Sequence, residues 1–259
     1  MKQPFHEAIR QDGLRFGLFV SLNSAIAAEA LAPSGFDYVV IDAEHSPLTP
    51  AGLHGMLTAF GTAGPEAIVR AASHDTPPIQ QYLDLGVRTL IFPNVRDAAD
   101  ARRVVAATRY PPQGHRGVAG TIRASRYGRD KSYLGQANDH IVVLAQIESR
   151  AGLANLDEIV ATDGVDGIYF GPNDMAADHG DLGQPMAAAN VERLTHAIRR
   201  VRELGKIAGI LCAETQLELY ASAGATLFAF ASDASLLVKA ADELAARHAG
   251  RHPGERRHA

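Results

Sequence analysis

The sequence predicts a single (β/α)8 TIM barrel, and three observations lead to that class. Short β-branched or aromatic runs alternate with longer, alanine-rich amphipathic segments, which is typical of parallel βαβ units. Eight such units can be counted along the chain. No composition shift and no Gly/Ser-rich linker divides the 259 residues, a length at which such barrels fold as one domain.

The expected strands alternate with helix-like stretches from one end of the chain to the other. Thr49 and Pro50 mark the start of the helix after the second strand, as a capping residue followed by proline at the first helical position. Glycines close four helical stretches, which predicts left-handed helix ends at Gly35, Gly86, Gly205 and Gly224. The strands are expected at 16–22, 38–42, 67–70, 89–92, 141–147, 167–170, 207–211 and 227–231.

Two segments stand outside this alternation. Residues 109–139 are irregular and rich in Pro, Gly and Arg, and they are either a functional loop or a variable surface excursion. The Arg/His-rich residues 248–259 are expected to be a frayed, solvated tail, which leaves 1–247 as the barrel domain. A doubly wound open sheet is the competing architecture, but no Gly-x-Gly-x-x-Gly motif opens the first helix.

The composition favours a small-molecule partner. Lys and Arg number 25 against 29 Asp and Glu, and the net charge of -4 offers no positive field for nucleic acid or an anionic membrane. Cys212 is the only cysteine, so no intrachain disulfide can form. Residues 1–15 lack the apolar core of a signal peptide, and no apolar run approaches the ~20 residues of a membrane span. We therefore expect a cytoplasmic protein.

Polar residues follow several of the predicted strands, where barrel enzymes carry their catalytic groups. Gln146 and Glu148 lie two apart on an otherwise apolar strand, so both point to the same face of the sheet. A buried carboxylate needs a partner, so Glu148 is either a metal ligand or ion-paired with an arginine. Asp174 follows 174 − 148 = 26 residues later, about one βα unit, which places it at the neighbouring strand end.

Two oxygen ligands at adjacent strand ends suit a hard cation such as Mg²⁺ or Mn²⁺, with positions left for water and substrate. The alternative for Asp174 is a capping role at the start of the helix that follows Gly171 and Pro172.

His45 and Arg70 are the candidates for proton transfer and anion binding. Asp42 and Glu44 can orient the imidazole of His45 as a general base, although a purely structural histidine is the alternative. Arg70 closes an apolar strand and could bind a carboxylate or an enolate oxygen, or form a salt bridge with a nearby acid. Asp84 lies near a helix end, and we expect it to be structural unless a subunit interface brings it to His45.

Absent motifs narrow the chemistry further. A Schiff-base aldolase needs a lysine aimed into the barrel, and none of the four lysines follows the carboxyl end of a predicted strand. There is no nucleophile elbow, no His-x-His pair and no glycine-rich phosphate loop after strands seven or eight. Strand seven ends in apolar residues around Leu211, which suits a small methyl or alkyl group.

Four motifs resemble the HpcH/HpaI aldolases: Asp-Ala-Glu-His-Ser-Pro at 42–47, Arg-Tyr-Pro-Pro-x-Gly-x-Arg-Gly at 109–117, Gln-Ile-Glu at 146–148 and the run at 164–174. The resemblance extends from residue 16 to about residue 244. It implies a class II pyruvate aldolase that binds a divalent ion (Mg²⁺, Mn²⁺ or Co²⁺) and acts on a 2-oxo acid and an aldehyde in aromatic or sugar-acid catabolism. The residues that it implies are Glu148 and Asp174 for the metal, His45 with an acidic partner as the base, Arg70 at the pyruvate oxygen, Gln146 at the substrate, and backbone N–H groups around Gly171 and Pro172 at the carboxylate.

The resemblance also implies hexamers, in which trimers pair by exchange of terminal helices. This chain departs from the family pattern at Phe19, where relatives often have tryptophan, and at Asn173, which replaces a small residue. Both departures bear on the choice of aldehyde and leave the metal residues intact. The competing interpretations are a lyase acting on a CoA thioester and a non-catalytic metal-binding barrel.

Overall fold

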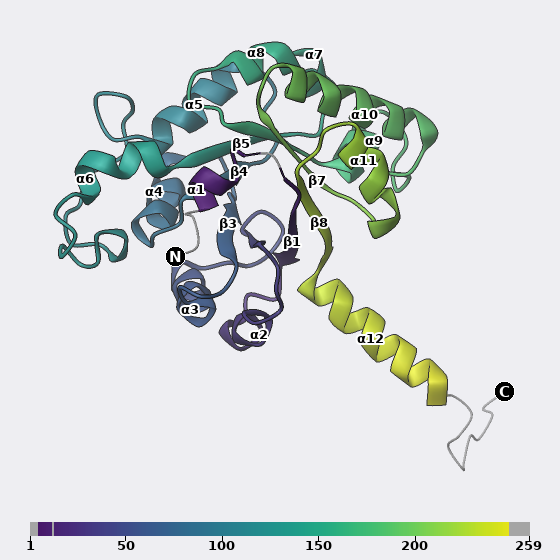
Figure 1. The fold of residues 1–259 in the computed structure, drawn as a ribbon, viewed down its shortest axis with the longest axis horizontal. Coiled ribbons are helices and arrows are strands. Elements are labelled where there is room, and N and C mark those ends of the chain that lie inside the picture. Colours follow the sequence, from purple (N-terminus) through teal and green to yellow (C-terminus); the bar gives the residue numbers. More distant parts are fainter. Residues whose placement is uncertain (1–4, 12, 249–259) are drawn as a thin grey trace.

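Eight parallel strands close into a barrel in chain order, which confirms the predicted fold class (Figure 1). The computed structural model describes residues 5–11 and 13–248, so most of the predicted tail lies outside the described residues. The observed strands begin and end within two residues of the predicted bounds. They are β1 (Arg15–Val20), β2 (Tyr38–Asp42), β3 (Glu66–Arg70), β4 (Thr89–Phe92), β5 (Val142–Ile147), β6 (Gly167–Phe170), β7 (Ile207–Leu211) and β8 (Leu227–Ser232).

Helices follow the strands and cover the outside of the barrel, because the outward side chains of the strands are apolar. The Thr49 hydroxyl accepts a hydrogen bond from the Gly52 N–H at 3.0 Å, which confirms the predicted start of α3. All four predicted helix-ending glycines have positive φ. The helices are α1 (Phe5–Ala8), α2 (Ala25–Leu31), α3 (Pro50–Phe60), α4 (Thr76–Asp84), α5 (Ala98–Thr108), α6 (Tyr133–Gln136), α7 (Arg150–Ala154), α8 (Leu156–Ala161), α9 (Pro172–Asp178), α10 (Ala188–Glu203), α11 (Leu217–Ser222) and α12 (Asp233–His248), with short 3-10 turns η1 (Arg123–Ser125), η2 (Ala137–His140) and η3 (Glu214–Gln216).

The barrel interior is a second packed layer, built from the inward side chains of the strands. Its two largest members are Tyr38 and Tyr169, both fully buried. Each faces a glycine on the neighbouring strand, since Gly17 is in register with Tyr38 and Gly209 with Tyr169. A Cβ at either glycine would lie 2.3 Å or 2.6 Å from the opposing ring, so the glycines make room for the phenols.

The irregular segment 109–139 is anchored to the barrel through Arg116. The Arg116 side chain is 1% exposed, and its Nη2 donates to Asp84 Oδ1 at 2.7 Å. The guanidinium carbon lies 4.4 Å from the centroid of the Tyr110 ring. These contacts fix the segment against the end of α4, close to the amino ends of β4 and β5.

The last described helix, α12, leaves the barrel and points away from it (Figure 1). Its residues from 235 to 248 are exposed, including Leu237 at 60% and Leu244 at 53%. Near the start of this helix, the half-buried rings of Phe16 on β1 and Phe230 on β8 stack with their centroids 5.8 Å apart. Within the described ranges, no helix combines the length and apolarity that crossing a membrane requires.

Candidate active site

A buried ion pair joins the carboxyl ends of two neighbouring strands. Asp42 is in register with Arg70, and the Arg70 Nε and Nη2 atoms donate to the two oxygens of Asp42 at 2.9 Å and 2.7 Å. Burial alone would raise the pKa of Asp42, but the hydrogen bonds and charge of Arg70 lower it below its usual value. Glu44 adds a second carboxylate, 3.2 Å from Arg70 Nη1. The arginine is thus held in one orientation by two acids.

Glu148 directly follows β5 at the carboxyl-end mouth of the barrel, and it is 6% exposed. The Asn94 backbone N–H donates to its Oε1 at 2.7 Å, and Gln146 Nε2 donates to its Oε2. Burial, followed by the negative charges of Glu44 and Asp174, raises the pKa of Glu148 to about 7. The ion pairs of Arg70 join it to Asp42 and Glu44, and Glu148 acts on Arg70 through its charge, so the choice between a metal ligand and an arginine partner for Glu148 stays a prediction.

Asp174 lies in the first turn of α9 and is exposed. Gly171 is the residue that precedes this helix, so the capping role that we considered for Asp174 is wrong. Gly171 itself is packed tightly, because a Cβ there would lie 2.4 Å from Glu148 Oε2. The lack of a side chain at Gly171 lets the start of α9 approach the Glu148 carboxylate.

Two adjoining pockets open at this mouth. The inner pocket has a volume of about 280 Å³ and the outer pocket about 630 Å³. The outer pocket also takes in Asp42, and it runs over the ends of β7 and β8. Nine of the predicted residues line the inner pocket together: Phe19, His45, Arg70, Gln146, Gly171, Pro172, Asn173, Asp174 and Leu211.

His45 is exposed at the mouth. Its backbone N–H donates to Asp42 at 3.3 Å, and its side chain is 63% exposed. The Nε2 atom lies 3.6 Å from Glu44 Oε2. The histidine can therefore contact both a bound molecule and solvent, while the acids at its base orient it.

Asp84 is the one predicted site residue that the fold does not bring to this mouth. It ends α4 at the opposite end of the barrel, where it accepts a hydrogen bond from Arg116. The reason is topological, because a helix between parallel strands runs back to their amino ends. Within one chain, Asp84 is thus no part of the site, and an approach to His45 across a subunit interface stays a prediction.

Sequence reasoning missed two contributors to the site. Asn94 supplies its backbone N–H to Glu148, and it follows β4 directly after Pro93 with φ of 49°. Its position after a strand end was the available signal. Tyr169 lines the inner pocket, and its alternation with Gly167 and Gly171 along β6 could have marked it as inward-facing.

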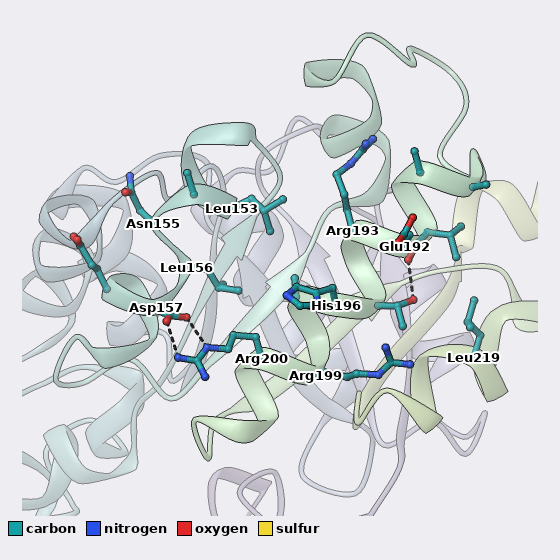
Figure 2. Close-up of a pocket in the computed structure, with 17 residues that line it drawn as sticks. Leu153, Asn155, Leu156, Asp157, Glu192, Arg193, His196, Arg199, Arg200 and Leu219 are labelled. Carbon is teal, nitrogen blue, oxygen red and sulfur yellow. Dashed lines mark hydrogen bonds and ion pairs between the residues drawn. The ribbon is translucent and has the colours of Figure 1, made fainter.

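A wider groove of about 1,080 Å³ lies on the outer wall between α8 and α10 (Figure 2). Two of its charged side chains pair with each other, since Arg200 Nε and Nη2 donate to Asp157 at 2.9 Å and 2.7 Å. It includes none of the residues that follow the strands at the mouth. The larger volume of this groove therefore does not make it a better candidate for the active site than the two pockets at the mouth.

A closed parallel barrel with buried carboxylates, a fixed arginine and an accessible histidine at its carboxyl-end mouth defines an enzyme of the (β/α)8 class. The model of the HpcH/HpaI aldolase/citrate lyase family matches residues 15–240. The 4-hydroxy-2-oxo-heptane-1,7-dioate aldolase of Escherichia coli is 41% identical over 249 residues, with 95% of each chain covered.

Comparison with solved structures also finds proteins of this fold and family. A family protein from Burkholderia cenocepacia is 33% identical and superposes with a TM-score of 0.90, covering 94% of this chain and 98% of that one. The citrate synthase SbnG is 25% identical, with a TM-score of 0.84 and 96% and 99% covered. The chain belongs to the HpcH/HpaI aldolase/citrate lyase family, and it is a carbon–carbon lyase.

Proposed function

We propose that the chain is a divalent-metal-dependent class II aldolase that cleaves or forms a 4-hydroxy-2-oxo acid, to or from pyruvate and an aldehyde. The observation that carries the proposal is the buried Glu148 carboxylate beside two further acids, Glu44 and Asp174, whose negative charges add to the effect of burial and raise its pKa to about 7. Carboxylates crowded in this way are stabilised in their charged form by a bound cation. The aldolase relatives support the reaction class.

The residues present fit a hard divalent cation. In residues 5–11 and 13–248, no three His, Cys, Asp or Glu side chains converge as a closed metal cage. Mg²⁺ and Mn²⁺ need no such cage, because one or two carboxylates with water and substrate oxygens commonly bind them. Glu148 and Asp174 would hold the ion, and Gln146 Oε1, buried without a hydrogen-bond partner, leaves an acceptor beside them. Co²⁺ suits the same ligands.

When bound, the cation would supply Lewis-acid stabilisation of the negative charge that develops on the enolate oxygen. Arg70 supplies a second positive charge at the inner pocket, and Asp42 fixes its guanidinium before any substrate arrives. Such preorganised charge is worth more in a buried site than in water. Gln146 and the turn of Gly171, Pro172 and Asn173 line the same pocket and would orient the 2-oxo acid.

His45 would act as the general base. In the cleavage direction it takes the proton from the C4 hydroxyl of the hydroxy-oxo acid, and the C3–C4 bond breaks. The electron pair of that bond becomes the enolate of pyruvate, and the other fragment leaves as the aldehyde. Protonation at C3 then gives pyruvate. The exposure of His45 allows it to return its proton to solvent.

Phe19 and Leu211 line both pockets, so they lie where the inner pocket meets the outer one. The outer pocket is the space for the aldehyde fragment, with Pro185 and Met186 on its apolar wall. The cytoplasm stays the predicted location, and aromatic or sugar-acid catabolism the predicted setting.

The exposed helix α12 supports the prediction that the protein forms a homo-oligomer, which we expect to be a hexamer. Leu237 and Leu244 are seven residues apart, two helical turns, so they share one face of the helix with Ala241. The half-buried Phe16 and Phe230 on β1 and β8 offer an apolar surface of the kind such a face covers. We propose that α12 of a second copy packs on this surface of β1 and β8.

Analytical ultracentrifugation tests this packing. The Leu237→Asp variant should sediment as smaller assemblies than the wild type, and the Lys239→Asp variant, changed on the same helix, should sediment like the wild type.

The aldolase proposal is tested by solvent deuterium exchange into the methyl group of pyruvate, followed by NMR. We expect exchange that requires added Mg²⁺ or Mn²⁺ and that falls more than about 100-fold in Glu148→Gln and in Asp174→Asn. The matched control is Glu158→Gln, an exposed glutamate on α8, which should exchange like the wild type. Exchange that needs no metal, or that survives in both site variants, would contradict the proposal.

A further inference from the structure

A small cavity lies close to the amino ends of β4 and β5, at the end of the barrel away from the candidate active site. Its described lining includes three basic side chains, Arg88, Arg116 and His140, and no acidic one. The volume is about 40 Å³. One water molecule needs about 10–15 Å³, and pockets for organic ligands have roughly 300–1,000 Å³. The cavity therefore has the size for a single small ion.

The Arg116 guanidinium is buried with more hydrogen-bond donors than its neighbours accept. Its side chain is fully buried, and Nη2 donates to Asp84 Oδ1 at 2.7 Å and to the Tyr133 hydroxyl at 3.2 Å. Nε and Nη1, which carry three of the five N–H bonds of an arginine, have no hydrogen-bond partner among residues 5–11 and 13–248. The nearby Tyr110 ring is at most a weak acceptor. Because buried donors without a partner destabilise a fold, an acceptor at this position would stabilise it.

The surroundings of the cavity favour a negatively charged acceptor. His6 is 6% exposed, and its ring centroid lies 4.7 Å from that of His140. Burial lowers the pKa of His6, and the positive charges of His140 and Arg88 lower it further. The nearby acid Glu66 interacts with Arg88 through charge, without a hydrogen bond. The potential at this end of the barrel is therefore positive, and an anion gains more from it than a water molecule does.

We propose that this cavity is a binding site for one small inorganic anion, chloride, which accepts hydrogen bonds from Nε and Nη1 of Arg116. Arg88 and His140 supply further positive charge. The inference goes beyond the proposed function, because it concerns the end of the barrel away from the candidate active site. The bound anion completes the hydrogen bonding of Arg116 and so strengthens the attachment of the segment 109–139 to α4.

Chloride binding is measured by the broadening of the chloride NMR signal, with gluconate keeping the ionic strength constant. We expect saturable broadening that bromide displaces. Arg116→Lys keeps the charge but loses the planar set of donors, so the affinity should fall at least about tenfold. Arg88→Gln removes an exposed charge beside the cavity and should weaken binding about two- to fivefold. The matched control is Arg102→Gln, an exposed arginine on α5 that does not line the cavity, and it should bind chloride like the wild type.

A crystal soaked in sodium bromide locates the ion, because bromide scatters anomalously and water does not. We expect a bromide peak in contact with Arg116 Nε and Nη1. Circular dichroism checks that each variant is folded, and the exposed Arg88→Gln variant carries the test if Arg116→Lys does not fold. Wild-type affinity in the folded Arg116 or Arg88 variant, an equal loss in Arg102→Gln, or a cavity that holds only water would overturn the assignment.

Discussion

Two buried arginine–aspartate pairs lie at opposite ends of the barrel, and their surroundings differ. At the carboxyl end, Arg70 is bound to Asp42 and stacks 5.0 Å from the Phe19 ring. At the amino end, Arg116 is bound to Asp84 and stacks 4.4 Å from the Tyr110 ring. Charge, burial and an aromatic neighbour are common to both, so none of these features defines a site.

The groups around each pair make the difference. Arg70 borders two open pockets and has further carboxylates nearby, of which Glu44 and Glu148 contribute to its raised pKa. Arg116 borders a cavity of only about 40 Å³, lined by Arg88 and His140 and by no carboxylate. The pair at the mouth can accept a substrate and a cation, whereas the other pair attaches the segment 109–139 to α4.

Among the variants that test the difference between the two arginine–aspartate pairs, Arg70→Lys should have the largest effect. Lysine keeps the charge but cannot reproduce the two-pronged contact with Asp42, so the exchange rate with pyruvate should fall about 100- to 1,000-fold. The pyruvate concentration dependence of NMR-detected exchange separates this loss from weaker binding. The matched control is Arg103→Lys, an exposed arginine paired with Asp100 on α5, for which we expect a change below about twofold. Equal losses in both variants would contradict a special role for Arg70.

Gly171→Ala should produce the next largest effect. The added Cβ would lie 2.4 Å from Glu148 Oε2 and 2.9 Å from Glu148 Cβ, so the carboxylate must move. We expect Mn²⁺ affinity to fall roughly 10- to 100-fold, as for other changes that disturb the orientation of a metal ligand. Isothermal titration calorimetry measures it. Gly135→Ala on α6, where an added Cβ has nothing within 4 Å, is the control, and unaltered affinity in Gly171→Ala would count against the proposed ligand.

The smallest expected effect is on the pH dependence of stability in the absence of metal. Because the folded pKa of Glu148 is about 7 and its usual value is 4.5, the folded chain binds this proton more tightly than the unfolded chain. Its contribution to stability is therefore present at low pH, is lost as pH rises from 4.5 to about 7, and stays absent above that. We expect the free energy of unfolding, measured with urea, to fall by about 1–2 kcal/mol over this pH range. The loss should be missing in Glu148→Gln and in the presence of Mg²⁺; a flat wild-type profile would refute it.

Most of the barrel could be predicted from the sequence, because its strands and helices have local signals. The alternation of β-branched runs with amphipathic stretches and the capping pair Thr49 and Pro50 depend only on neighbouring residues. The direction of α12 could not be predicted in this way. Its apolar residues indicate a helix face that needs cover, but the sequence does not say which surface covers it.

The site was predictable where it follows strand ends, since β-sheet geometry determines which side chains meet. Gln146 and Glu148 illustrate this, because their two-residue spacing at the end of β5 brings Gln146 to the inner pocket and Glu148 into hydrogen-bond contact with it. Asp84 illustrates the limit. Its partner Arg116 lies 32 residues away in a segment without periodicity, and only the folded chain shows that the two meet.

The central claim is that Glu148 and Asp174 together hold one divalent cation at the carboxyl-end mouth. Titration of Mn²⁺ followed by electron paramagnetic resonance tests it most directly. We expect one tight site per chain, weakened more than about 100-fold in Glu148→Gln and in Asp174→Asn, and unaltered in Asp84→Asn at the other end of the barrel. Wild-type affinity in the Glu148 and Asp174 variants, or loss of the site in Asp84→Asn, would contradict the claim.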